Sequence, residues 1–138
     1  MIRLVEALNY RSLRYIRQPL GPFHVLVGPN ASGKSTFLDV LGFLQRLVSD
    51  GPDAAVGERT SNFHDLTWMR KGDRFELAVE ALVPEEERPC VDLILGGEGY
   101  AVRYELAVGM GEGTRDLRIL DEQLLVTETY EIPEIEVP

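Results

Sequence analysis

Residues 28–36 read Gly-Pro-Asn-Ala-Ser-Gly-Lys-Ser-Thr, a glycine-rich stretch that ends in a lysine and two hydroxyl residues. Residues 28–35 satisfy the pattern G-x-x-x-x-G-K-[ST], in which a glycine-rich turn surrounds the phosphates of a nucleotide. Gly28 and Gly33 allow the tight turn, so that successive amide groups point inward at an anion. The helix expected after the turn adds unpaired amides and the positive end of its dipole. The pattern therefore predicts a phosphate-binding loop.

The polar side chains at the end of the loop have separate expected roles. Lys34 is expected to reach the β- and γ-phosphates, Ser35 to coordinate Mg²⁺, and Thr36 to bond the α-phosphate. ATP and Mg²⁺ are the expected ligands. The alternative interpretation is a chance glycine-rich turn that only caps a helix.

The segments on either side of the loop support the first interpretation. Residues 23–27, Phe-His-Val-Leu-Val, are rich in β-branched and aromatic types and predict a buried strand. After the loop, apolar residues recur at helical spacing up to Val48, and Gly51-Pro52 ends the pattern. A helix of about four turns is expected here. A phosphate-loop pattern is most credible between a strand and a helix.

The remaining residues predict extended structure. Two short strands joined by a turn are expected in residues 1–17. Further on, apolar residues alternate with charged ones, as in strands with one wet face. These later strands are expected at residues 75–83, 91–95, 102–108, 117–126 and 130–137. Together they predict an antiparallel meander.

The expected fold class is therefore α/β (α+β), with a strand, phosphate loop and helix packed against the meander. We expect one partial domain over residues 1–138. Its expected parts are a core at 1–50, a loop-rich connection at 51–74 and an antiparallel β subdomain at 75–138.

Composition narrows the class of protein further. The formal net charge is −9, which disfavours a surface that attracts nucleic acid everywhere. No apolar run approaches the roughly 18 residues that cross a bilayer. The N-terminus has no secretory pattern, and the single cysteine can form no internal disulfide. A cytoplasmic protein without a membrane partner is expected.

A known family is resembled by residues 8–13, Leu-Asn-Tyr-Arg-Ser-Leu, by the strand expected within residues 19–27, and by residues 28–41. They are similar to the N-terminal lobe of ABC-type ATPases of the SMC, RecF and OLD-nuclease group, including bacterial "AAA family" relatives. The likeness is closest over residues 1–50. It implies that Arg11 lies near the nucleotide phosphates and that Asn30 approaches the γ-phosphate. Ala31 departs from the glycine usually found at its position.

The expected nucleotide-binding residues lie in the loop, at the start of the helix and in the first turn of the chain. They are Gly28, Asn30, Ser32, Gly33, Lys34, Ser35, Thr36 and Arg11, with Ser35 as the metal ligand.

The resemblance also implies partners and a limit on activity. Complete relatives enclose two ATP molecules between two heads, and a signature motif, a Walker B acid and a switch histidine complete each site. The sequence offers no convincing equivalent of these, so we expect nucleotide binding with poor hydrolysis or none. The expected partners are the missing C-terminal ATPase lobe or a partner head, with DNA as a partner of the complete protein. A truncation, a designed fragment or a degenerate copy is expected.

Asp121-Glu122 has two interpretations. Residues 117–122 resemble a Walker B strand, in which the Asp would hold Mg²⁺ through water and the Glu would orient the attacking water. However, Arg118 interrupts the apolar run and the extended pattern continues beyond the acids, which favours a strand of the meander.

Two other classes of function remain open. A small P-loop kinase uses the same loop but needs further parallel strands and an arginine-bearing lid. A non-catalytic interaction module would keep the loop as a relic.

Overall fold

An antiparallel sheet of five strands forms the body of the computed structural model, which describes residues 1–87, 100–111, 113 and 116–128. The strand order across the sheet is β2-β1-β3-β4-β5. The strands are β1 (Ile2–Tyr10), β2 (Leu13–Pro19), β3 (Arg74–Leu82), β4 (Tyr100–Met110) and β5 (Leu117–Glu128). The meander predicted from alternation is confirmed over β3, β4 and β5, and β1 pairs with β3 in the same sheet. The strands predicted at 91–95 and 130–137 lie outside the described residues.

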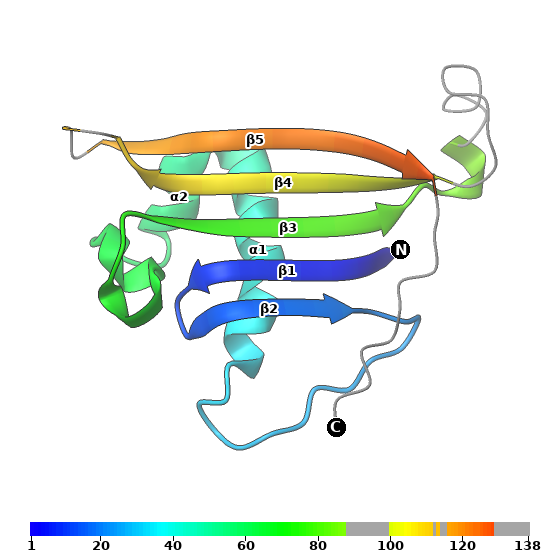
Figure 1. Ribbon diagram of the computed structural model, residues 1–138, viewed down its shortest axis with the longest axis horizontal. Helices are drawn as coiled ribbons and strands as arrows, with labels where there is room; N and C mark the ends of the chain where they lie inside the picture. Colours follow the sequence, from blue (N-terminus) through cyan, green and yellow to red (C-terminus); the bar gives the residue numbers. More distant parts are fainter. Residues whose placement is uncertain (88–99, 112, 114–115, 129–138) are drawn as a thin grey trace.

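The helices follow the loop along the chain, and α1 covers one face of the sheet. They are α1 (Lys34–Asp50), α2 (Pro52–Gly57) and three short 3-10 helices, η1 (Phe63–Leu66), η2 (Trp68–Arg70) and η3 (Glu85–Glu87). Figure 1 shows α1 crossing the strands behind the sheet. The helix predicted after the loop is confirmed, and it ends where the Gly51 amide donates to Leu47 O at 2.8 Å. Within the described residues, no helix has the length and apolar content to cross a membrane.

An aromatic cluster joins α1 to the sheet. Phe75 of β3 has no exposed surface, and its ring centroid lies 5.0 Å from that of Tyr10, 5.3 Å from that of Phe43 and 5.8 Å from that of Phe63. Phe43 is on the apolar stripe of α1, which packs on the sheet along one side of the helix. The cluster therefore fixes where α1 lies on the sheet.

The strand predicted at residues 23–27 is wrong for this structure. The segment forms no strand, and Phe23 and Val27 are 83% and 85% exposed. A strand requires a hydrogen-bonded neighbour, and among the described residues no strand pairs with this segment, since β2, the strand before it, is paired with β1 alone. Figure 1 shows the chain leaving β2 and passing away from the sheet before it enters α1. The apolar pattern of residues 23–27 indicates side chains suited to burial, but no described element covers them.

The Asp121-Glu122 pair lies in β5, the edge strand, which is antiparallel to β4. The Glu122 carboxylate accepts a hydrogen bond from the Tyr104 hydroxyl at 2.6 Å. Burial and then this bond raise the pKa of Tyr104 to about 12. An antiparallel edge strand supports the meander interpretation, because a Walker B acid ends a central parallel strand.

Candidate functional site: the loop before helix α1

The ammonium group of Lys34 holds the predicted phosphate loop in a closed turn. Lys34 Nζ donates to Gly28 O at 2.7 Å, to Pro29 O at 2.6 Å and to Ser32 Oγ at 3.3 Å. A lysine ammonium has three donors, so the loop itself occupies all of them. The longest contact, to Ser32, is the one that a phosphate oxygen would most easily replace.

Gly33 brings the loop into the helix. Its φ of 94° is in the left-handed region, where glycine has no steric penalty. A Cβ at this position would lie 3.1 Å from Leu13 Cδ2, so a larger residue would also press on the start of β2. Without a side chain, Gly33 leaves the first amides of α1 uncapped. Those amides and the positive end of the helix dipole favour an anion.

Ala31 occupies a backbone conformation that suits glycine better. Its φ is 65°, and a left-handed conformation costs an alanine about 1–2 kcal/mol. This is the position at which the sequence departs from the glycine of the family it resembles. The structure gives that departure a physical meaning, which is strain in the loop.

Replacing Ala31 with glycine is therefore expected to raise the free energy of unfolding by about 0.5 kcal/mol, since relief of strain exceeds the entropy that glycine loses on folding. Urea unfolding followed by circular dichroism measures the change. Ala54→Gly in α2, where the backbone is helical, is the matched control and is expected to lower the same quantity by about 1 kcal/mol. Equal losses in both variants would contradict strain at Ala31.

The turn between β1 and β2 contacts the start of α1. The Ser12 hydroxyl donates to Thr36 Oγ1 at 2.8 Å, and Arg11 NH1 donates to Asp39 Oδ2 at 2.9 Å. Arg11 has a φ of 50°, so the turn carries strain of its own. The structure thus brings the turn with Arg11 to the same helix end as the loop.

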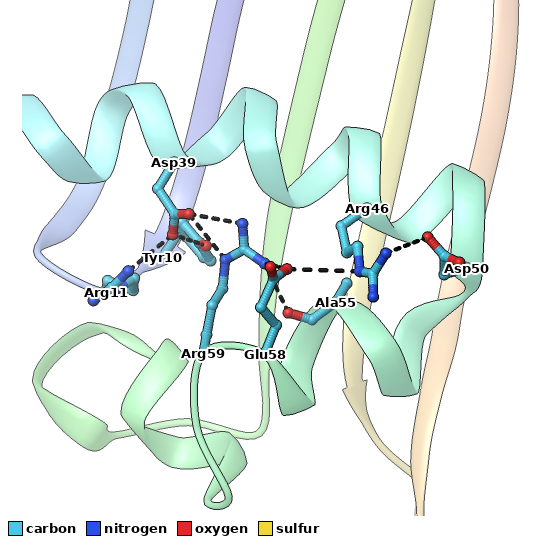
Figure 2. A network of polar contacts seen from close by, with 8 residues as sticks. All are labelled: Tyr10, Arg11, Asp39, Arg46, Asp50, Ala55, Glu58 and Arg59. Carbon is cyan, nitrogen blue, oxygen red and sulfur yellow. Dashed lines mark hydrogen bonds and ion pairs between the residues drawn. The ribbon is translucent and has the colours of Figure 1, made fainter.

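Asp39 joins three separated parts of the chain. Its carboxylate accepts hydrogen bonds from the Tyr10 hydroxyl at 2.6 Å, from Arg11 NH1 and from Arg59 Nε at 2.9 Å. Arg59 NH2 lies 2.8 Å from Asp39 Oδ1. Figure 2 shows these side chains converging on Asp39 from β1, from the turn after it and from the segment after α2. We call Tyr10, Arg11, Asp39 and Arg59 the Asp39 cluster.

The Asp39 cluster keeps the carboxylate ionised. Burial alone would raise the pKa of Asp39, but the hydrogen bonds from Arg59, Tyr10 and Arg11 together lower it below its usual value. Burial, followed by the bond to Asp39, raises the pKa of Tyr10, so this phenol stays protonated as a donor. Asp39 is thus a charged acceptor shared by two arginines and one phenol.

Acid is expected to weaken the fold through this cluster. Because the pKa of Asp39 is lower in the folded chain than in the unfolded one, its contribution is complete above about pH 4. The contribution disappears as the pH falls through the lower value of the folded chain. Acid titration followed by tryptophan fluorescence should show a steeper loss of stability below about pH 4 in the wild type than in Asp39→Asn. Parallel curves would contradict a lowered pKa.

Some predicted site residues are placed together, and others make no described side-chain contact. Lys34 and Ser32 meet in the loop, while Thr36 is joined to the turn that carries Arg11. Asn30 and Ser35 are exposed. Sequence reasoning assigned no role to the other residues that organise this region, which are Tyr10, Ser12, Asp39 and Arg59. One weak signal was Gly42, where a Cβ would lie 3.4 Å from Arg59 NH2, because a glycine inside a helix indicates a close approach.

A comparison with protein families agrees with the loop. The family model described as "AAA domain, putative AbiEii toxin, Type IV TA system" matches residues 23–98, more than half of the chain. The match begins before the loop and extends beyond β3. It supports an N-terminal region like that of AAA/ABC-type P-loop ATPases, and a nucleotide-binding, ATPase-like function in general.

Proposed function

The chain belongs to this AAA domain family, and from that premise we propose that it binds ATP with Mg²⁺ through residues 28–36. We propose further that it acts as the N-terminal lobe of an SMC/RecF/OLD-like ATPase from a DNA-maintenance or defence protein. The observation that carries the proposal is the ammonium of Lys34, which gathers two loop carbonyls at the uncapped start of α1.

The loop supplies the kinds of groups that a triphosphate needs. Its exposed residues and the first amides of α1 offer main-chain donors, and Lys34 adds a positive charge. On binding, Lys34 would exchange its long contact with Ser32 for a phosphate oxygen. Asn30 and Arg11 would contribute polar contacts from the loop and from the adjacent turn.

The residues present also fit a magnesium ion. Mg²⁺ takes few protein ligands and completes its octahedron with waters and phosphate oxygens. The exposed Ser35 hydroxyl, in the first turn of α1, is a suitable single ligand. When bound, the metal would neutralise charge on the β- and γ-phosphates.

A partner surface is the other part of the proposal. Phe23, Val25 and Val27 are exposed before the loop, and Leu38 and Val48 are exposed along α1. Exposed apolar side chains of this kind mark surfaces that another protein surface covers. We propose that a C-terminal ATPase lobe or a partner head covers them and supplies the residues for hydrolysis.

The alternative function of a small kinase has no support from the sheet. A small kinase would continue with parallel strands, whereas β3, β4 and β5 are antiparallel.

Isothermal titration calorimetry on the full chain tests the binding. MgATP is expected to bind at least tenfold more tightly than AMP, a difference in binding free energy of about 1.4 kcal/mol. The reason is that the loop binds the phosphates and makes no contact with the base. Sodium phosphate at matched ionic strength controls for nonspecific anion binding. Absence of heat with MgATP, or equal affinity for AMP, would reject the proposal and favour the relic loop.

A further inference from the structure

The Asp39 carboxylate has one fixed side and one accessible side. On the fixed side, Tyr10 has no exposed surface, and the Arg59 side chain is 12% exposed with its guanidinium 5.2 Å from the ring centroid of Phe43. Arg59 NH1 also donates to Ala55 O at 2.9 Å. These contacts leave the carboxylate little freedom to rotate.

On the accessible side, the carboxylate holds Arg11. The Arg11 side chain is 43% exposed, and among the described residues its side-chain contact is the one from NH1 to Asp39 Oδ2. A guanidinium carries five donors in a planar fork. One anchored donor therefore restricts the orientations of the group and leaves the other donors able to bind an anion.

The direction matters because of what lies beside Arg11. The next residue, Ser12, donates to the hydroxyl of Thr36 in the first turn of α1. Asp39 follows on the same helix, so the loop, the hydroxyl and the anchored guanidinium all lie at the N-terminal end of α1. An arginine without such an anchor would lose more side-chain entropy on binding a phosphate.

We propose that Asp39 is a positioning residue, which aims Arg11 at the nucleotide and contacts no part of the nucleotide itself. This inference rests on the proposed function, since it requires phosphates at the loop. Arg59 and Tyr10 hold Asp39, and Asp39 holds Arg11. Affinity thus depends on a residue from the segment after α2, far along the chain from the loop.

A double-mutant cycle separates positioning from simple support of the fold. MgATP affinity is measured by calorimetry for the wild type, Asp39→Asn, Arg11→Gln and the double variant. We expect each single change to weaken binding about tenfold, and the double variant to be within about twofold of Arg11→Gln. A purely structural Asp39 would instead give losses that multiply, to about a hundredfold in the double variant.

Asp50→Asn is the matched control, because Asp50 is also on α1 and pairs with an arginine, Arg46, at the opposite end of the helix. Its affinity for MgATP should equal that of the wild type. Asp39→Glu keeps the charge and displaces the carboxylate by one methylene, and it replaces Asp39→Asn in the cycle if the asparagine variant unfolds. The same dependence on Arg11 is expected for it.

A spectroscopic measurement completes the test. The Arg11 Nε–H resonance should shift on addition of MgATP in the wild type and shift less in either Asp39 variant. Wild-type affinity in both Asp39 variants, or multiplying losses, would overturn the positioning role while leaving the proposed function intact. A wild type that binds no MgATP would reject the proposed function itself, and the positioning role with it.

Discussion

Replacing Lys34 with alanine is expected to weaken MgATP binding by about a hundredfold, which is about 2.7 kcal/mol. The ammonium is the one lysine charge at the loop, and its bonds to anionic oxygens are stronger than those between neutral groups. The alanine variant also removes the three contacts that close the turn. Calorimetry with MgATP measures the loss directly.

The fold should tolerate this substitution. The loop carbonyls that Lys34 contacts belong to exposed residues, so water can replace the ammonium there. The midpoint of urea unfolding is therefore expected to change little. Lys71→Ala is the matched control, because Lys71 is the other lysine of the chain and is also exposed. If the Lys34→Ala variant bound MgATP like the wild type, the binding would lie elsewhere than at this lysine and its loop.

The parts of this site that the sequence predicted are those governed by local rules. A helix start, a glycine turn and a lysine at fixed spacing are encoded within residues 28–36, and the helix follows from periodicity. Local rules could not predict the contact of Ser12 with Thr36, because it depends on how the chain before β2 approaches α1. For Asp39, the sequence indicated only a polar position on the expected helix. Its three partners come from distant segments, which no local pattern can bring together.

The strand expected at residues 23–27 is absent, which shows what an apolar pattern alone cannot predict. Apolar, β-branched side chains indicate a segment suited to a sheet, but a pattern cannot supply the neighbouring strand. In the described part of the chain no strand pairs with this segment, and Val25 remains 61% exposed. The same reasoning was successful for β3 and β4, where each strand has its partners within the described sheet.

Replacing Phe75 with alanine is expected to lower the free energy of unfolding by about 3–5 kcal/mol. Phe75 is fully buried and contacts the rings of Tyr10, Phe43 and Phe63, so its removal leaves a cavity between α1 and the sheet. Urea unfolding followed by circular dichroism measures the change. Phe23→Ala, at a side chain 83% exposed, is the matched control and should change stability by less than about 0.5 kcal/mol.

Because this loss approaches the whole stability of a small domain, part of the Phe75→Ala population should be unfolded even without urea. A ligand that binds only the folded chain restores stability, by about 2.7 kcal/mol at a hundred times its dissociation constant. MgATP should therefore refold the variant measurably, whereas AMP at the same concentration should not. Recovery with MgATP that persists when Lys34→Ala is added would mean that the nucleotide stabilises the chain elsewhere than at the loop.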